Sequence, residues 1–264
     1  MVDAVARFSG FSEAYDAARP RPPAVLAELI CQWADIASPE VVDLGSGSGL
    51  SLLPWAGRAR RVTAVEPSAT MREVADRRIA ALGADAEAFT LVDATAEDTG
   101  LPAQSADVVT ASQAMHWFDP DRALPEIARI LRPGGVVAAY DCDWPPSVDW
   151  ETDAAYETFH AKTRALEETY GLRPAYADKR DHAERMRRSG LFRFVTEVAV
   201  HSREEGDAAR MVDIALSQGG AVALRDVGVS DDELGLAGLR AVAARRLPSP
   251  KPWWWTYRVR MAVR

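Results

Sequence analysis

The chain has 264 residues, of which 48% are hydrophobic and 27% are charged, as in a globular protein with a sizeable buried core. Its formal net charge of −8 disfavours a large nucleic-acid partner, because an acidic surface repels phosphate backbones. The first residues lack an apolar signal core and no run of 18 apolar residues occurs, so neither secretion nor a membrane partner is expected. Cys31 and Cys142 form no metal-type spacing and indicate reduced thiols in a cytoplasmic protein.

Short apolar runs alternate with helical segments in the first half of the chain. Strands are expected at residues 41–44, 62–65, 89–92, 108–111 and 136–140. Helices are expected at residues 23–36, 69–82 and 120–131, with Ser68 and Asp119 as N-caps of the last two. This alternation predicts right-handed βαβ units and one mostly parallel sheet.

The pattern changes after Asp143. Residues 144–190 look mostly helical, residues 191–201 alternate as a strand, and further helices are expected near residues 207–217 and 230–245. The last residues alternate between apolar side chains and the arginines 258, 260 and 264, which predicts a half-exposed strand. Such a strand is often an antiparallel addition to a parallel sheet.

The most informative segment is Val-Val-Asp-Leu-Gly-Ser-Gly-Ser-Gly-Leu at residues 41–50. A buried strand leads into Gly45, Gly47 and Gly49 and then into an expected helix, which is the arrangement of a nucleotide site at the end of a first strand. A dinucleotide fingerprint would place its third glycine at position 50, where this chain has Leu. A plain strand-turn-helix connection is the alternative, although it rarely needs three alternate glycines.

Glu66 ends the second expected strand, 21 residues after Gly45. An acid at this place is positioned to accept hydrogen bonds from both hydroxyls of a ribose. The alternative is an exposed acid that caps the following helix. With the glycine turn in place, the ribose interpretation is favoured.

Together these residues resemble the class I S-adenosylmethionine-dependent methyltransferases, and in particular the small-molecule, trans-aconitate methyltransferase-like group of the type 11 methyltransferases. The resemblance covers roughly residues 8–142. It rests on the glycine turn and Glu66, and on segments similar to the lid, adenine loop, post-strand segment and fifth-strand turn of that group: 15–20, 93–102, 111–118 and 131–135.

The resemblance implies a Rossmann-like α/β fold with a mostly parallel seven-stranded sheet, an antiparallel last strand and a helical lid. We expect a single methyltransferase domain over residues 1–264. Its expected parts are an N-terminal helical lid (1–37), a cofactor-binding core (38–143), a helical substrate lid (144–190) and C-terminal strands and helices that complete the sheet (191–264).

The resemblance also implies that S-adenosylmethionine is the cofactor and S-adenosylhomocysteine the product. Asp43 would orient the methionine amino group, directly or through water, and Glu66 would hold the ribose. Arg19 would pair with the cofactor carboxylate, with a solvated helix-end charge as the alternative. The cofactor residues implied by the motifs are Tyr15, Arg19, Asp43, Gly45, Ser46, Gly47, Gly49, Glu66, Pro67, Met71, Asp93, Thr95, Ala96, Ser112 and Gln113.

His116 is the candidate catalytic base closest to the expected cofactor site, because it follows the fourth strand. Packing beside Trp117 and Phe118 is the interpretation we favour over catalysis at this stage. His160 is a weaker candidate, whereas His182 and His201 look like surface or strand positions. The histidines form no metal spacing with acids or cysteines, so no metal is expected.

Eight tryptophans indicate aromatic walls suited to an apolar acceptor. The candidate substrate residues are Trp117, Trp144, Trp150, Tyr156 and His160, although packing of the lid is the favoured alternative for most of them. Residues 253–255 are all tryptophan and precede the expected last strand, where at least one should point outward. The basic residues between 179 and 188 are expected to form a solvated helix face.

The leading functional hypothesis is methyl transfer to a small molecule, with secondary metabolism as one setting. The alternatives are a macromolecular methyltransferase acting on RNA or protein, a protein that binds the cofactor without catalysis, and an oxidoreductase. No Asn/Asp-Pro-Pro-Tyr/Phe segment follows the fourth strand, which disfavours methylation of nucleobases. The acceptor atom and the oligomeric state stay open, with a homodimer as one candidate.

Overall fold

The computed structural model describes residues 18–172 and 178–264. The described chain divides into two compact units. The first unit contains residues 18–20, 143–172 and 201–256, and the second contains residues 21–142, 178–200 and 257–264. The expected division of one domain into four parts is not tested by these units and stays a prediction.

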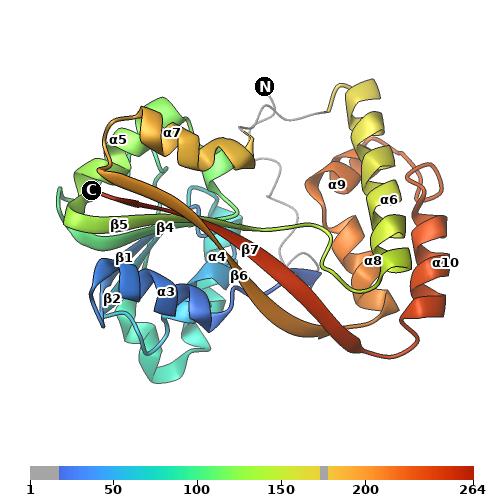
Figure 1. Ribbon diagram of the computed structural model, residues 1–264, viewed down its shortest axis with the longest axis horizontal. Helices are drawn as coiled ribbons and strands as arrows, with labels where there is room; N and C mark the ends of the chain where they lie inside the picture. Colours follow the sequence, from blue (N-terminus) through green and yellow to red (C-terminus); the bar gives the residue numbers. More distant parts are fainter. Residues whose placement is uncertain (1–17, 173–177) are drawn as a thin grey trace. The chain divides into compact units, whose positions relative to one another are not determined.

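A seven-stranded sheet in the order β3-β2-β1-β4-β5-β7-β6 organises the fold (Figure 1). Its strands are β1 (Glu40–Leu44), β2 (Arg61–Val65), β3 (Phe89–Val92), β4 (Ala106–Ser112), β5 (Leu131–Cys142), β6 (Phe194–Gly206) and β7 (Lys251–Val263). The pairs β1–β2, β1–β4, β2–β3 and β4–β5 are parallel, and β7 runs antiparallel to β5. The expected Rossmann-like sheet with an antiparallel last strand is confirmed.

Helices cover the parallel part of the sheet in the second unit. They are α3 (Ala24–Ala34), α4 (Ala69–Ala80), α5 (Pro120–Ile130) and the short α7 (His182–Arg188). In Figure 1, α5 and α7 lie above β4 and β5, and α3 lies below them. The side chains of Ser68 and Asp119 cap α4 and α5 as expected, by accepting hydrogen bonds from the backbone N–H groups of residues 71 and 121. The parallel strands read as apolar runs because both of their faces are covered.

The first unit is mainly helical. It contains α6 (Trp150–Thr169), α8 (Ala208–Leu216), α9 (Gly219–Asp226) and α10 (Leu236–Arg246). Helix α6 packs against α9 and α10, and α8 packs against α10. The sequence predicted the first, second and fourth of these helices, but α9 was not expected.

The structure corrects four expectations. A 3-10 helix, Leu50–Trp55 (η1), follows the glycine turn in place of an α-helix, and it contains Pro54. Strand β7 begins at Lys251, so the three tryptophans lie inside it; Trp253 and Trp255 are buried and Trp254 points outward. Helix α10 begins six residues later than expected, at Leu236.

The remaining correction concerns buried charge. We expected Arg260 on a half-exposed strand, but only 2% of its surface is exposed. Strand β7 lies between β5 and β6 in the sheet, so Arg260 has a neighbouring strand on each side. The guanidinium is accommodated there because it pairs with Asp141 and Glu197.

Cys31 and Cys142 are buried and take part in no disulfide. Within the described ranges, none of the helices combines the length and apolarity that crossing a membrane requires.

Candidate functional site

The glycine turn connects β1 to η1 at the carboxyl end of the parallel strands. Gly45, Gly47 and Gly49 all have positive φ, at 65°, 53° and 81°. The N–H groups of Gly45 and Ser46 donate to the carbonyl oxygen of Val65 at 2.9 and 3.2 Å, which ties the turn to the end of β2. The chain therefore bends sharply at the sheet edge, in a conformation that residues with side chains adopt only under strain.

The first two glycines are required for different reasons. A Cβ at Gly45 would lie 2.8 Å from the Cβ of Ala114, so the position is closed by the packed protein itself. A Cβ at Gly47 would meet nothing within 4 Å. Gly47 therefore presents bare backbone to open space, as a ligand that approaches the main chain requires.

Glu66 is joined directly to this turn. Its Oε2 accepts from the N–H of Gly47 at 2.9 Å, and its Oε1 accepts from the N–H of Ser68 at 2.9 Å. The residue is 8% exposed, and burial raises the pKa of its carboxyl group above the usual value. Glu66 is thus a preoriented carboxylate beside Gly47 rather than an exposed helix cap.

Asp43 lies beneath the turn, fully buried in β1. Its two carboxylate oxygens accept from the hydroxyl groups of Ser51 on η1 and Thr110 on β4, both at 2.5 Å. Burial raises the pKa of Asp43 to about 6, against the lowering effect of these two hydrogen bonds. Asp43 therefore links β1, η1 and β4; its contact with a cofactor amino group stays a prediction.

Arg72 connects the end of β2 to the segment after β3. It donates to the carbonyl oxygen of Glu66 and to the carboxylate of Asp93, both at 2.7 Å. The Asp93 side chain is otherwise largely exposed, and Ala96 is buried in the apolar core. Thr95 forms an isolated bridge with Asp98. The residues expected around the adenine thus follow β3, whereas Arg72 was not identified from the sequence.

Ser112 and Gln113 follow β4 along the same edge. Gln113 has a φ of 53°, uncommon for a residue with a side chain, and its N–H donates to the carbonyl oxygen of Tyr140. Its side-chain amide donates to the Sγ of Cys142 at 2.9 Å and accepts from the Nζ of Lys179 at 2.8 Å. Gln113 therefore connects the ends of β4 and β5 to the segment before α7.

His116 lies in a short 3-10 helix, Met115–Trp117, and is 6% exposed. Its ring packs against that of Trp117, with centroids 5.2 Å apart, as the packing interpretation expects. Its Nδ1 also lies 3.7 Å from the Oδ1 of Asp141, near the end of β5. The expected aromatic neighbour is therefore present, and a carboxylate that was not expected lies on another side of the ring.

His182 was expected at the surface, and this was wrong, because it is only 1% exposed. It begins α7 with its ring 6.4 Å from that of His116. Within the basic run of residues 179–188, Lys179 and Arg185 are partly buried, whereas Arg180 and Arg188 are exposed to solvent. The predicted solvated helix face is therefore correct for only part of the run.

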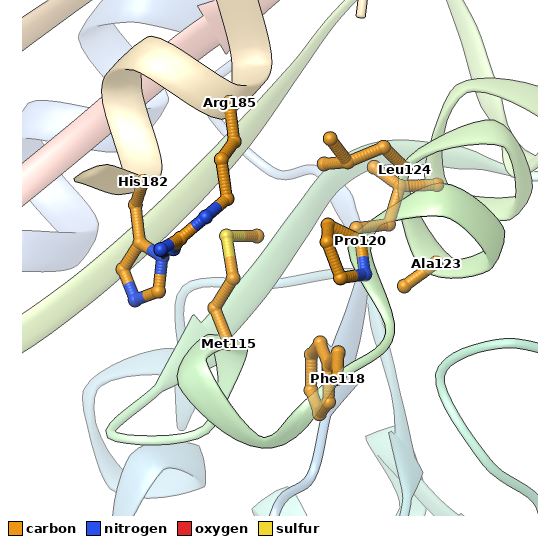
Figure 2. Close-up of a pocket in the computed structure, with 8 residues that line it drawn as sticks. Met115, Phe118, Pro120, Ala123, Leu124, His182 and Arg185 are labelled. Carbon is orange, nitrogen blue, oxygen red and sulfur yellow. Dashed lines mark hydrogen bonds between the residues drawn. The ribbon is translucent and has the colours of Figure 1, made fainter. Parts of the chain in front are cut away.

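A small hollow lies between α5 and α7. Figure 2 shows the side chains of Phe118, Pro120 and Leu124 on one side and those of His182 and Arg185 on the other, with Met115 between them. The lining is apolar apart from the two α7 residues. It adjoins the His116 segment without containing the glycine turn.

The expected substrate residues are divided between the units. Trp117 lies in the second unit, while the first unit holds Trp144, Trp150, Tyr156 and His160. Tyr156 is fully buried beside Phe159 and His160, and Trp150 is 77% exposed. Burial and the nearby Arg164 lower the pKa of His160. Their roles toward a substrate stay predictions.

Two expected cofactor residues belong to the N-terminal segment. Tyr15 lies outside the described residues. Arg19 belongs to the first unit, where it donates to the carbonyl oxygen of Ser217 at 3.2 Å and stacks over the ring of Trp144 at 4.8 Å. Trp144 in turn meets Trp255 edge-on at 5.1 Å. Arg19 therefore has contacts with Ser217 and Trp144 within its own unit. Its pairing with a cofactor carboxylate stays a prediction.

The sequence left several of the polar partners unidentified. They are Ser51, Arg72, Thr110, Asp141, Lys179 and Arg260. None of them lies in a recognisable motif, and all but Ser51 contact a residue that is distant in sequence. In the part of the chain that the structure describes, no three His, Cys, Asp or Glu side chains group in a way that could hold a metal ion.

The parallel sheet and the turn at its carboxyl edge define a Rossmann-like α/β protein with a candidate site for a nucleoside. Residues 42–139 match the family model described as "Methyltransferase domain". Residues 42–139 therefore form a methyltransferase domain of the class I, S-adenosylmethionine-dependent type.

Individual relatives agree with this assignment. The chain is 38% identical over 126 residues to an uncharacterized methyltransferase of Mycobacterium tuberculosis, covering 46% of each chain. It is 32% identical over 131 residues to the malonyl-[acyl-carrier protein] O-methyltransferase of Serratia marcescens, covering 49% of each. The matched segment thus spans about half the length of these curated relatives.

A solved structure extends the likeness over almost the whole chain. The fold is similar to that of a putative type II methyltransferase from Anaeromyxobacter dehalogenans, with a TM-score of 0.67 and 29% identity, covering 93% of this chain and 97% of that one. The likeness therefore includes the parts of the chain beyond residues 42–139.

Proposed function

We propose that this protein transfers a methyl group from S-adenosylmethionine to a small-molecule acceptor. The observation that carries the proposal is the direct link between the glycine turn and the acid proposed to hold the ribose: Glu66 accepts from the N–H of Gly47. Of the first two glycines of the turn, only Gly47 faces open space, and the Glu66 carboxylate lies beside it. The domain assignment supplies the reaction class.

The residues present fit the cofactor. A nucleoside needs a main chain without side chains against it, and Gly47 offers this. Its ribose needs charged acceptors, and the carboxylate of Glu66 is held in place by two backbone donors. S-adenosylmethionine supplies an electrophilic methyl group on a sulfonium when it is bound.

The chain's own contribution to such a reaction is positioning and exclusion of water. Methyl transfer is an in-line displacement, so most of the rate gain comes from holding the acceptor atom close to the methyl carbon. Asp43 stiffens the turn by joining β1 to η1 and β4. His116 is the candidate base for an acceptor that arrives protonated.

Two features favour a small acceptor over a macromolecule. The chain is acidic overall, with a net charge of −8, whereas a nucleic acid is bound by a basic surface. The segment after β4 begins Gln113-Ala-Met-His rather than with a prolyl-prolyl aromatic motif. The relative in Serratia marcescens, named as an O-methyltransferase, supports oxygen as one acceptor atom.

Calorimetry with S-adenosylhomocysteine and with NAD tests the cofactor assignment. We expect a one-to-one complex with S-adenosylhomocysteine and none with NAD, because the third glycine is one residue too early for a dinucleotide. Binding of NAD in place of S-adenosylhomocysteine would refute the proposal.

A turnover assay separates an enzyme from a protein that only binds. The protein is incubated with methyl-labelled S-adenosylmethionine and pools of small phenols, carboxylic acids and amines, and in parallel with total RNA and with protein extract. We expect label in the small-molecule pools. Label in RNA or protein would favour the macromolecular alternative, and cofactor binding without label anywhere would favour a non-catalytic role.

A further inference from the structure

Two acids lie next to each other where β2 and β3 end. Val65 and Val92 are paired in the parallel register of these strands, and the N–H of Glu66 donates to the carbonyl oxygen of Val92 at 3.0 Å. Glu66 and Asp93 are therefore the next residues along neighbouring strands, about one strand spacing of roughly 4.8 Å apart. Since Glu66 is bonded to Gly47 of the glycine turn, Asp93 lies one strand farther along the same sheet edge.

Arg72 joins these two acids from α4. Its Nη1 donates to the backbone carbonyl oxygen of Glu66 and its Nη2 donates to the Oδ2 of Asp93, both at 2.7 Å. The guanidinium is planar and its donors have fixed directions, so the two bonds orient the Asp93 carboxylate relative to the end of β2. The acid that follows β3 is thus held by the same element that supports the acid at the glycine turn.

The second oxygen of Asp93 is open. The side chain is 68% exposed, and within residues 18–172 and 178–264 no group donates a hydrogen bond to its Oδ1. Ala96 of the same segment has no polar side chain and is buried in the core. Asp93 therefore presents one oriented carboxylate oxygen, which can only accept a hydrogen bond.

Charge indicates which end of the cofactor reaches β3. A nucleoside whose ribose is held at Glu66 has its base on one side of the sugar and its 5′ substituent on the other. Along the sheet edge, one of them lies toward β3 and the other toward β1 and β4. The 5′ substituent of S-adenosylmethionine carries a carboxylate, which two adjacent acids would repel, whereas the base carries an amine, which a carboxylate accepts. The base is therefore the group expected at Asp93.

We propose that Arg72 is a positioning residue that fixes the open oxygen of Asp93 as the acceptor for the 6-amino group of the base, so that the site selects a 6-aminopurine over a 6-oxopurine. This inference deepens the proposed function and rests on it. A 6-oxopurine has a carbonyl oxygen in place of the amine, so two acceptors would face each other without a proton between them. Its nearest donor is the N1–H, which Asp93 reaches only by turning away from Arg72.

Calorimetry with S-adenosylhomocysteine and S-inosylhomocysteine measures this selectivity. The second ligand differs only in its 6-oxo group and in the N1 proton that accompanies it. We expect the unmodified protein to bind S-adenosylhomocysteine at least about tenfold more tightly, because a site that accepts from an amine rejects an analogue that lacks it. Equal affinities would overturn the proposal, since Asp93 would then not distinguish the two bases.

Arg72→Met removes both donors and keeps an unbranched, flexible side chain. Asp93 is then free to turn toward N1–H, so we expect the affinity ratio of the two ligands to fall several-fold. Arg72→Lys keeps a cation with several donors and should restore part of the ratio. A purely structural role of Arg72 would weaken both ligands equally and leave the ratio unchanged, and that result would contradict the proposal.

Asp93→Asn tests the acceptor itself. A side-chain amide offers its oxygen to an amine or its NH2 group to a carbonyl oxygen, so it suits both bases. The preference for the 6-amino ligand should therefore largely disappear in this variant. A ratio like that of the unmodified protein would mean that another group recognises the base.

Arg77→Met is the matched control. Arg77 lies on the same helix α4, but its side chain is exposed. This variant should leave both affinities and their ratio unchanged. Circular dichroism establishes that each variant is folded. If Arg72→Met is not, Arg72→Lys and the largely exposed Asp93→Asn still test the ratio.

The two ligands also separate this inference from the proposed function. Normal binding of S-adenosylhomocysteine with an equal affinity for S-inosylhomocysteine would remove only the roles of Arg72 and Asp93. Absence of S-adenosylhomocysteine binding to the unmodified protein would instead remove the proposed function, and this inference with it.

Discussion

Glu66 combines, in one side chain, a structural and a proposed binding role. Its carboxylate accepts hydrogen bonds from the N–H groups of Gly47 and Ser68. A carboxylate accepts more than one hydrogen bond on each oxygen, so these bonds leave lone pairs for the hydroxyls of a ribose. At the residue scale, the site is therefore a prearranged acceptor rather than a flexible acid.

Glu66→Ala should weaken binding of S-adenosylhomocysteine by about 1–3 kcal/mol, because the ribose hydroxyls lose charged acceptors on leaving water. Calorimetry of the variant measures the change. Glu73→Ala, on the exposed face of α4, is the control and should bind like the unmodified protein. Unchanged affinity in Glu66→Ala would remove this residue from the cofactor site.

The β1–η1 turn is the element on which the site depends. Gly45 is required by packing against Ala114, whereas a Cβ at Gly47 would meet no atom of the protein within 4 Å. Asp43, at the β1 end of the turn, accepts from Ser51 at the η1 end and from Thr110 on the neighbouring strand β4. The turn is thus packed and hydrogen-bonded on its inner side and carries no side chain at Gly47 on its outer side. This arrangement suits a loop that receives a ligand.

A comparison of Gly47→Ala with Gly83→Ala separates the effect of ligand approach from the effect of backbone strain. Both Gly47 and Gly83 have positive φ, at 53° and 64°, and at both a Cβ would meet nothing within 4 Å. Alanine at either should cost about 1 kcal/mol of folding stability. We expect only Gly47→Ala to lower S-adenosylhomocysteine affinity, by at least tenfold, in calorimetry. Equal affinities in the two variants would show that the ligand does not approach Gly47.

The buried Asp43 predicts a pH-dependent stability. Its folded-state pKa of about 6 lies above the usual aspartate pKa of about 3.9, so between these values the folded state holds a proton that the unfolded state has lost. The free energy of unfolding should therefore fall as pH rises from 4 to 7, by an Asp43 contribution on the order of 2–3 kcal/mol.

Asp43→Asn cannot ionise and should lack this contribution. Urea unfolding at several pH values measures it as the difference between the unmodified protein and the variant. That difference should move in favour of the variant as pH rises from 4 to 7. A difference that is constant with pH would mean that Asp43 titrates near its usual pKa in the folded protein.

At the scale of the whole molecule, charge and the division into units set the context of the site. The parallel sheet and its glycine turn belong to the second unit, and the helices α6, α8, α9 and α10 belong to the first. The formal net charge is −8. Long-range electrostatics therefore disfavour association with polyanions.

Fluorescence anisotropy with labelled total RNA tests this prediction. We expect no binding below about 100 µM at physiological salt, the weak end of non-specific affinities for nucleic acids. Tighter binding that weakens steeply with added salt would reveal a local basic surface and favour the macromolecular alternative. A homodimer likewise stays a prediction, which analytical ultracentrifugation can measure.

The sequence by itself determined the parallel strands, the two capped helices and the placement of Glu66 beside the glycine turn. These features depend on local patterns: apolar runs, N-cap residues and glycines at fixed spacing. The implied roles of Ala96 and Arg19 toward a cofactor rest on the family resemblance and are not decided by their contacts.

Only the tertiary structure decided which distant side chains meet. Asp141, Lys179, His182 and Arg260 carry no common motif, and the sequence placed the last two at or near the surface. They come together because β7 enters the sheet beside β5 and α7 begins over the same edge, where burial makes each charge depend on the others. Local patterns cannot encode such contacts, since their energy depends on the spatial proximity of residues that are far apart in the chain.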